Sequence, residues 1–228
     1  MELLETPLGL DPLADHVLPL PQVAAPVDPC DAIALALVSV GWCLSDDFLS
    51  EALVAELRLE ALTLRHAGVF HRAGIGRGRG LEVRGEIRGD EVLWLAPDLA
   101  TCAQRTYLER IEELRLVLNS ALYLGLFDFE GHLAVYPPGS FYRRHLDCFH
   151  GVEARTVTCV LYLNESWSAA DGGQLRLYAD PANLKVGTDI LPLGGRLVTF
   201  LSADVPHEVL PGGRERMSVT GWLKRRRD

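Results

Sequence analysis

The chain has 228 residues, of which 48% are hydrophobic and 23% charged, so a wholly disordered, collagen-like or coiled-coil chain is excluded. Its length suits one enlarged domain better than two equal ones. The formal net charge of −9 argues against unspecific binding to nucleic acid or anionic lipid, so neither nucleic acid nor membrane is an expected partner.

The N-terminal stretch, residues 1–29, holds six of the thirteen prolines. Because each proline removes a backbone donor, we expect an irregular arm. No apolar run approaches the roughly 18 residues of a membrane-spanning helix, and the start of the chain lacks the basic flank of a secretory signal. The five cysteines form an odd set without a C-x-x-C pair, which predicts neither disulfides nor structural zinc and indicates a reducing, cytoplasmic location.

Three helices are predicted in the first half of the chain, where apolar residues recur at three- and four-residue steps. They cover residues 32–40 after an N-cap at Asp31, the stretch from Asp46 to Gly68, and residues 101–124. Between the second and third helices, residues 81–87 and 91–95 read as two strands of a hairpin, joined by a turn at 88–90.

After Gly125 the pattern changes to short apolar runs separated by Gly, Pro, Asn and Asp, which is typical of strands. The runs cover residues 132–136, 156–163, 174–178, 189–191, 195–201 and 216–223. Helices followed by strands predict an α+β, mainly β fold, a sandwich or jelly roll buttressed by the N-terminal helices. We therefore expect a single domain over residues 30–228, with helical support at 30–125 and a β core at 126–224.

Two histidines and one aspartate in the β half form a candidate metal site. Alternate residues of a strand project from one face, so His145 and Asp147 can reach the same metal while Leu146 points into packing. His207, from a distant strand, completes the facial triad that binds Fe(II) and leaves positions for a co-substrate and O2. Taken alone, the pattern also fits a chance His-x-Asp pair and a histidine that caps a turn after Pro206.

Arg216 supplies a second observation. It begins the alternating run 216–222 and shares a face with Ser218. A buried guanidinium pointing towards the metal needs an anion, and its planar fork suits a carboxylate. 2-Oxoglutarate fits both ends, because its oxo-acid end chelates iron while its distal carboxylate meets Arg216, with the Tyr162 hydroxyl as a second donor. By itself, Arg216 is better explained as a surface arginine at the start of a strand, and it is the combination with the triad that favours the clamp.

A longer co-linear set of residues extends this pattern over roughly residues 36–224. It includes Asp46-Asp47-Phe48-Leu49, Ile87-Arg88-Gly89-Asp90, Trp94, Tyr136-Pro137, Leu161-Tyr162-Leu163-Asn164, Gly172-Gly173-Gln174-Leu175-Arg176, Pro206-His207-Glu208-Val209, Arg216 and Trp222. The set resembles the 2-oxoglutarate- and Fe(II)-dependent prolyl hydroxylases of the hypoxia-sensing type and their small bacterial relatives. The resemblance implies a double-stranded β-helix, or jelly roll.

The resemblance also implies the cofactors, which are Fe(II), 2-oxoglutarate and O2, with ascorbate as a further candidate. The residues implied are His145, Asp147 and His207 for iron, Arg216, Tyr162, Tyr136 and the neighbouring Ser218 for 2-oxoglutarate, and Tyr142, Arg155 and Trp222 for the target proline.

Residues 72–80 match a substrate-covering loop of that family and are unusually rich in arginine and glycine. Arg77 and Arg79 are therefore candidates for contacting the substrate. The local positive charge suits the steering of an acidic protein partner, and it suits equally an exposed loop that collects charge.

These observations predict an Fe(II)- and 2-oxoglutarate-dependent dioxygenase that hydroxylates a prolyl residue of a protein and releases succinate and CO2. Since a C–H bond offers no acidic proton, no general base is nominated. The small bacterial relatives suggest elongation factor Tu as a candidate protein substrate. The alternatives are an oxygenase acting on another side chain or a free amino acid, and a non-catalytic sensor that binds Fe(II) and 2-oxoglutarate.

Overall fold

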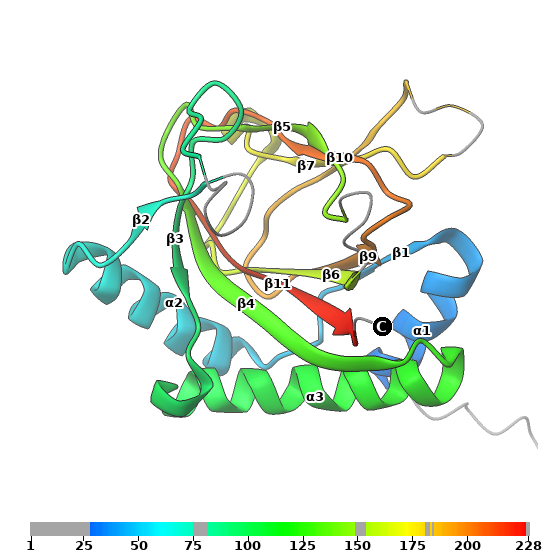
Figure 1. Cartoon of the computed structure of the whole chain (residues 1–228). Coiled ribbons are helices and arrows are strands. Elements are labelled where there is room, and N and C mark those ends of the chain that lie inside the picture. Colours follow the sequence, from blue (N-terminus) through cyan, green and yellow to red (C-terminus); the bar gives the residue numbers. More distant parts are fainter. Residues whose placement is uncertain (1–27, 75–81, 149–153, 181–182, 184, 227–228) are drawn as a thin grey trace, which may run out of the picture.

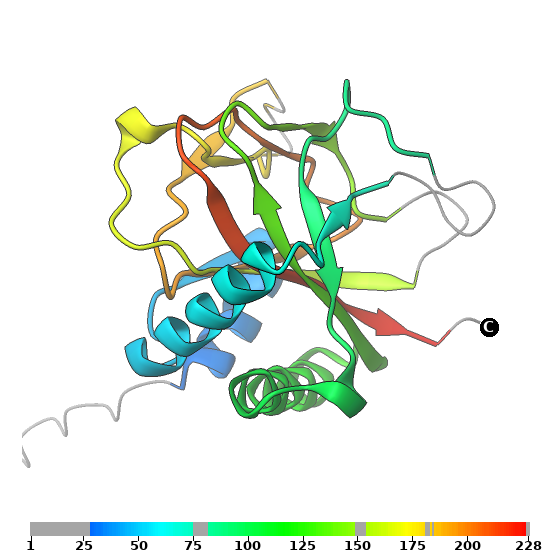
Figure 2. The same cartoon turned by 90° about the vertical axis from the view of Figure 1, so that its left-hand side faces the viewer.

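The structure, a computed structural model, describes residues 28–74, 82–148, 154–180, 183 and 185–226. Its strands form two antiparallel sheets, with the orders β1-β9-β6-β11-β4-β3-β2 and β5-β10-β7-β8. In Figure 1 the smaller sheet lies at the top, the larger sheet below it, and three helices beneath. Figure 2, turned by 90°, shows the same layers with the helix α3 nearly end-on. The predicted mainly β, double-sheet fold with helical support is confirmed.

The two sheets differ in strand length. The strands of the larger sheet are β1 (Trp42–Ser45), β2 (His71–Arg72), β3 (Glu91–Trp94), β4 (Leu126–Tyr136), β6 (Arg155–Tyr162), β9 (Leu197–Leu201) and β11 (Arg216–Arg225). Those of the smaller sheet are β5 (Tyr142–His145), β7 (Leu175–Leu177), β8 (Thr188–Ile190) and β10 (His207–Val209). Short 3-10 helices lie at Pro97–Leu99 and Ala169–Asp171.

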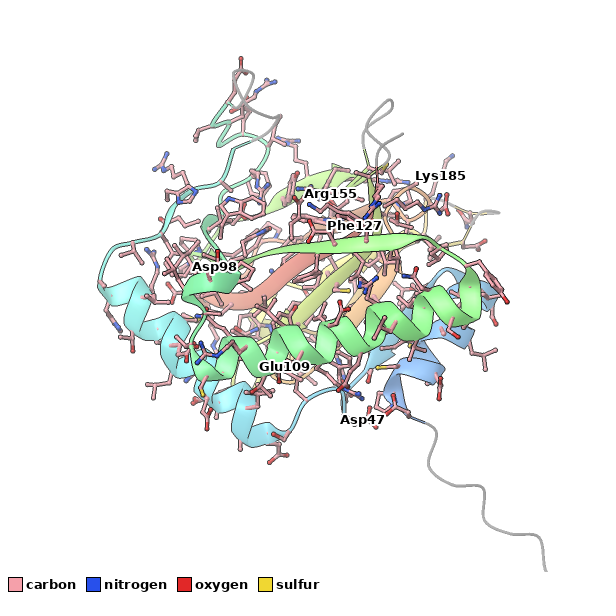
Figure 3. All side chains as sticks on the ribbon, turned by 60° about the horizontal axis from the view of Figure 1, so that its bottom comes forward. Asp47, Asp98, Glu109, Phe127, Arg155 and Lys185 are labelled. Atoms are coloured by element: carbon pink, nitrogen blue, oxygen red, sulfur yellow. The ribbon has the colours of Figure 1, made fainter. Side chains whose placement is uncertain are left out.

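The helices lie near their predicted positions. They are α1 (Pro29–Val40), α2 (Glu51–His66) and α3 (Cys102–Leu122). The N-cap of α1 is Asp28, whose side chain accepts from the Cys30 backbone N–H at 2.8 Å, and not the predicted Asp31. Figure 3 shows α3 crossing the outer face of the larger sheet, with Glu109 on its length.

Helix α2 starts later than its acidic signal suggests. Ser50 accepts from the Leu53 backbone N–H and caps the helix. The Asp46 carboxylate instead pairs with Arg196 at 2.7 Å, and Asp47 accepts from the Ser45 hydroxyl. The two aspartates therefore fasten the loop before α2 and are not part of its first turn.

Strict alternation along the central strands separates two cores. Strands β4, β6 and β11 send one set of side chains towards the helices: Leu133 and Val135, Val157, Cys159 and Leu161, and Met217, Val219 and Leu223. The intervening residues face the smaller sheet. Among them are Ala134, Tyr136, Val160 and Tyr162, which pack with Leu175, Leu177 and Val209. The β4–β11 and β6–β11 registers therefore decide which polar residues enter the space between the sheets.

The predicted hairpin at residues 81–95 is wrong. Strand β3 is present, but it pairs with β4, from Glu91↔Val135 to Trp94↔His132, and with the two-residue strand β2. Residues 85–87 form a turn, and Arg88 bridges to Tyr142. A turn-like sequence between two apolar runs specifies that the chain reverses, and not which strand each run pairs with.

No disulfide joins any of the five cysteines in the part of the chain that the structure describes. None of the helices in the described residues is long and apolar enough to cross a bilayer.

Candidate active site between the two sheets

A cavity of about 370 Å³ lies between the sheets. The larger sheet supplies one wall through the inward-facing residues of β4, β6 and β11, and the smaller sheet supplies the other through β5, β7 and β10. Tyr136 and Arg216 lie towards one end, and Glu130, Trp222 and Arg155 towards the other. The predicted metal ligands line the same cavity.

The three predicted metal ligands converge. His145 is the last residue of β5 and is paired with His207, the first residue of β10. Asp147 Oδ1 lies 3.5 Å from His145 Nε2, and Asp147 Oδ2 lies 3.6 Å from His207 Nε2. One donor atom from each residue falls within 4.8 Å of the other two.

The route to this geometry differs from the prediction. Strand β5 ends at His145, so Asp147 is not the second member of a strand pair. It lies in the bend that follows, and Leu146 lines the cavity instead of pointing into packing. The chain turn, together with the pairing of β5 with β10, brings the donors together.

The charge state of the triad suits a metal cation. Burial raises the pKa of the Asp147 carboxyl, but His207 and His145 outweigh it and hold that pKa well below its ordinary value. Burial, reinforced by His145, lowers the pKa of His207 to about 4. Near neutral pH, Asp147 is therefore a carboxylate and His207 a neutral imidazole, the forms that bind metal.

Backbone carbonyls select the histidine tautomers. His145 Nδ1 lies 2.7 Å from the Arg143 carbonyl oxygen, and His207 Nδ1 lies 3.1 Å from that of Val205. A carbonyl accepts only, so each Nδ1 carries a proton, which leaves Nε2 as the nitrogen that can offer a lone pair to a metal. Two imidazole nitrogens and one carboxylate fit Fe(II), the metal of two-histidine, one-carboxylate sites.

At one end of the cavity, Arg216 is a buried cation, only 3% exposed. Its guanidinium donates to the Tyr162 hydroxyl at 3.1 Å and lies over the Tyr136 and Tyr162 rings, while its Nε has no acceptor. Among the described residues, no carboxylate lies within salt-bridge distance of it. Burial raises the pKa of Tyr162, so its hydroxyl keeps a proton to donate. This end fits the distal carboxylate of 2-oxoglutarate.

The remaining residue predicted to bind 2-oxoglutarate is Ser218, which lies on the same face of β11. Its hydroxyl is 3.1 Å from that of Thr220, and it is Thr220 that lines the cavity. Sequence alternation places both residues inwards and does not rank them.

The other end of the cavity is aromatic. The Arg155 guanidinium lies 3.4 Å from the Trp222 ring centroid and donates to Glu130 at 2.8 Å. Trp222 Nε1 is buried and makes no hydrogen bond within the usual distance, although the indole helps to lower the pKa of Asp147. Arg155 is thus already paired and stacked, and it holds one wall of the predicted proline site.

On the opposite wall of the cavity, Tyr142 likewise packs against an arginine that is paired with a carboxylate. Its ring stacks on His145 at 3.6 Å between centroids and lies under the Arg88 guanidinium at 4.4 Å. Arg88 in turn is paired with the buried Asp90 at 2.7 Å. Burial raises the pKa of Tyr142 to about 12, so its hydroxyl remains protonated.

Two further residues of this end had no predicted role: His132, and Trp94, which belongs to the co-linear set described above. His132 is 3% exposed, lines the cavity, and lies 4.9 Å from the Trp94 ring and 5.5 Å from the Trp222 ring. Burial lowers its pKa to about 4, and its Nδ1 has no partner. Its position in the inward alternation of β4, two residues before Ala134 and four before Tyr136, was the available signal.

The predicted substrate contacts Arg77 and Arg79 lie outside the described residues. The neighbouring Arg72, at the start of the same arginine-rich stretch, lines the cavity together with His71 and Gly74.

Comparisons with known proteins identify the family of this chain. Residues 131–224 match the 2OG-Fe(II) oxygenase superfamily. Human "Prolyl hydroxylase EGLN3" is 33% identical over 199 residues, which cover 83% of this chain and 81% of the human protein. A crystal structure of a Pseudomonas putida prolyl-4-hydroxylase is 44% identical, with a TM-score of 0.78, and is matched over 87% of this chain and 100% of its own. A Trichoplax adhaerens prolyl hydroxylase, solved with a peptide of the hypoxia inducible factor oxygen degradation domain, is 30% identical, with a TM-score of 0.76 over 86% of this chain and 88% of that one.

Proposed function

The chain belongs to the prolyl hydroxylases of the 2-oxoglutarate- and Fe(II)-dependent oxygenase superfamily, and from that membership we propose a role for each residue of the cavity. The enzyme is a dioxygenase that hydroxylates a prolyl residue of a protein substrate. Bound Fe(II) supplies the O2 chemistry that couples oxidative decarboxylation of 2-oxoglutarate, to succinate and CO2, with insertion of one oxygen atom into a C–H bond.

The chain's own residues bind and orient the reactants. His145, Asp147 and His207 hold the metal, while Arg216 and Tyr162 hold the distal carboxylate of 2-oxoglutarate. The observation that carries these roles is the buried Arg216, which has no carboxylate partner among the described residues and lies at one end of the cavity that also contains the triad. Tyr136 borders the co-substrate, because its ring packs under the Arg216 guanidinium.

The target proline enters from the aromatic end. Tyr142 and Trp222 form opposite walls, and the paired arginines Arg88 and Arg155 hold these rings in place. An apolar, aromatic pocket suits a pyrrolidine ring and excludes water from the reacting carbon. The 4-position of the ring is the proposed site of hydroxylation, supported by the 44% identity to the Pseudomonas enzyme described as a prolyl-4-hydroxylase.

His145→Ala tests the metal assignment. The variant is expected to lose iron-dependent release of succinate and to bind Mn(II) more weakly, because one of three ligands is gone. The opposing result is wild-type turnover, which would place the metal elsewhere. His66→Ala, a histidine at the end of α2 and outside the cavity, is the matched control and retains both properties.

The protein substrate is a separate question, and elongation factor Tu is the proposed candidate. Incubation with that protein is expected to add one oxygen atom to a proline, as read by peptide mass spectrometry. Turnover with free amino acids alone would favour an oxygenase of small molecules. Addition of oxygen to another side chain would favour an oxygenase whose target residue is not proline. Absence of succinate release with every protein tested, despite tight binding of metal and 2-oxoglutarate, would favour a sensor.

The location proposed for this activity is the reducing cytoplasm. It is supported by the lack of any disulfide among the described cysteines, which is usual for cytosolic proteins.

A further inference from the structure

Asp147 is fastened to a different sheet from the two histidines beside it. His145 and His207 are paired with each other in the smaller sheet. The Asp147 carboxylate instead accepts a hydrogen bond from Thr158 Oγ1, with 2.8 Å to Oδ2. Thr158 lies in β6 of the larger sheet and is 1% exposed. The metal ligands are therefore held from both sides of the cavity.

The direction of the hydrogen bonds behind Asp147 follows from proton counting. Thr158 has one hydroxyl proton, and a carboxylate can only accept, so that proton points at Asp147. Ser202 Oγ lies 2.9 Å from Thr158 Oγ1. Because Thr158 has no second proton, Ser202 must be the donor in this bond. The two hydrogen bonds therefore run in one direction, with Ser202 donating to Thr158 and Thr158 donating to Asp147.

Ser202 is itself fixed by its backbone. It is fully buried and directly follows β9. Its N–H donates to the Thr156 carbonyl at 3.0 Å, and its carbonyl accepts from the Cys148 N–H at 3.3 Å. Both the side chain and the main chain of Ser202 thus connect β6 with the bend that holds Asp147.

The Asp147 carboxylate needs such support because little energy is required to rotate it about its last side-chain bond. The χ2 angle of Asp turns over a broad, two-fold profile, so packing alone does not fix the plane of the carboxylate. A hydrogen bond to one oxygen removes that freedom and satisfies a buried charge. Groups that orient the ligands of a metal raise its affinity without touching it.

We propose that Ser202 and Thr158 are positioning residues that act in series, Ser202 orienting Thr158 and Thr158 orienting the Asp147 carboxylate towards the two imidazoles. This inference rests on the proposed metal role of the triad. It predicts a graded order of importance, in which Thr158 matters more than Ser202 and Ser202 matters only while Thr158 is present.

Metal affinity of the full-length protein is the measurement, with Mn(II) or Co(II) as the probe in the absence of 2-oxoglutarate and O2. Thr158→Val keeps the shape of the side chain and removes the hydroxyl, and it is expected to weaken binding about 10- to 100-fold. Thr158→Ser restores the donor and is expected to bind nearly as wild type. Ser202→Ala is expected to weaken binding less than Thr158→Val does.

Thr199→Val is the matched control. Thr199 lies in β9 and is paired with Cys159, the residue that follows Thr158 in β6. Thr199 is 1% exposed, and its hydroxyl has no partner among the described residues. Its replacement removes a buried hydroxyl from the same sheet and is expected to leave metal affinity unchanged. Equal weakening by Thr199→Val and Thr158→Val would overturn the proposal, because it would show general disturbance of the sheet.

The double variant Thr158→Val/Ser202→Ala tests the series arrangement. It is expected to bind metal no more weakly than Thr158→Val alone, since the Ser202 hydroxyl acts on Asp147 through Thr158 and the Ser202 main chain is kept in both variants. If the losses of metal affinity in the two single variants add up in the double variant, the two residues act independently, and the series arrangement is overturned. If Thr158→Val binds metal as tightly as the wild-type protein does, the positioning proposal is overturned as well. If the wild-type protein does not bind metal through His145, it is the proposed function itself that fails.

Discussion

At the scale of single residues, the assignment of Arg216 makes the sharpest prediction. Arg216→Lys keeps the charge but loses the planar fork, so one hydrogen bond to the 2-oxoglutarate carboxylate disappears. We expect 2-oxoglutarate affinity to fall about 10- to 100-fold, or roughly 1.5–3 kcal/mol, measured calorimetrically with Mn(II) in place of iron. Mn(II) affinity without 2-oxoglutarate is the control and stays at the wild-type value. Undiminished 2-oxoglutarate binding would remove Arg216 from the site.

His132 predicts a pH dependence of stability. Burial lowers its pKa to about 4 from 6.5, so as pH falls the unfolded chain takes up the proton before the folded one. Its contribution to stability is complete above pH 6.5 and is lost as pH falls towards 4. When the pH is lowered from 7.5 to 5, the wild-type protein should therefore lose about 2 kcal/mol more unfolding free energy than the His132→Gln variant does, as measured by urea denaturation. Identical pH profiles would contradict a neutral, buried His132.

The chemistry-bearing residues were predictable individually, and their supporting partners were not. His145, Asp147, His207 and Arg216 are of rare types at informative spacings, and the structure brings them to one cavity. Thr158 and Ser202 are ordinary residues whose role depends on the pairing of β6 with β9 and on a bend after β5. Those contacts are set by tertiary structure, and no local pattern encodes them.

At the scale of elements, strand β11 reaches the cavity at a fixed register because Asn164 holds its start. Asn164 Oδ1 accepts from the Met217 N–H at 2.7 Å, and its Nδ2 donates to the Pro192 carbonyl at 2.7 Å. Asn164→Ala leaves both buried backbone groups unpaired and should cost roughly 2–4 kcal/mol of unfolding free energy. Since Met217 adjoins Arg216, 2-oxoglutarate affinity should fall as well.

The control for Asn164 is Asn183, an exposed residue whose side chain accepts from the Lys185 N–H within its own loop. Asn183→Ala is expected to change the free energy of unfolding by less than about 0.5 kcal/mol. Urea denaturation and 2-oxoglutarate binding of the two variants make the comparison. Equal effects would show that Asn164 has no special role in placing β11.

Element prediction succeeded where a periodic pattern was long and failed where strands were short. The α3 helix and strands β6, β9 and β11 lie close to their predicted ranges. Strands β5 and β10, which carry the two histidines of the proposed metal site, are four and three residues long, too short for alternation to show. The pairing of β3 with β4 joins segments separated by the whole of α3, and such distant partners are invisible to local turn signals.

At the scale of the whole molecule, the elements that line the cavity in the described part of the chain all follow Asp28. Asp28 supplies the N-cap of α1, and its carboxylate lies 3.4 Å from Arg110 on α3. A protein that begins at residue 28 is therefore expected to bind metal and 2-oxoglutarate as the full chain does. Its free energy of unfolding should lie within about 1 kcal/mol of the full-length value.

A chain that begins at residue 42 separates the contribution of α1 from that of the preceding residues. This helix buries Cys30, Ile33, Ala34 and Leu37 against the larger sheet and α3, with at most 4% of each exposed. Removing it uncovers apolar core worth roughly 5 kcal/mol, which is comparable to the total stability of a typical domain. We expect this shorter protein to lose cooperative urea unfolding, while the chain from residue 28 keeps it. If the chain from residue 28 unfolds normally but no longer binds 2-oxoglutarate, residues 1–27 contribute to the site, and the cavity defined by the two sheets is incomplete without them.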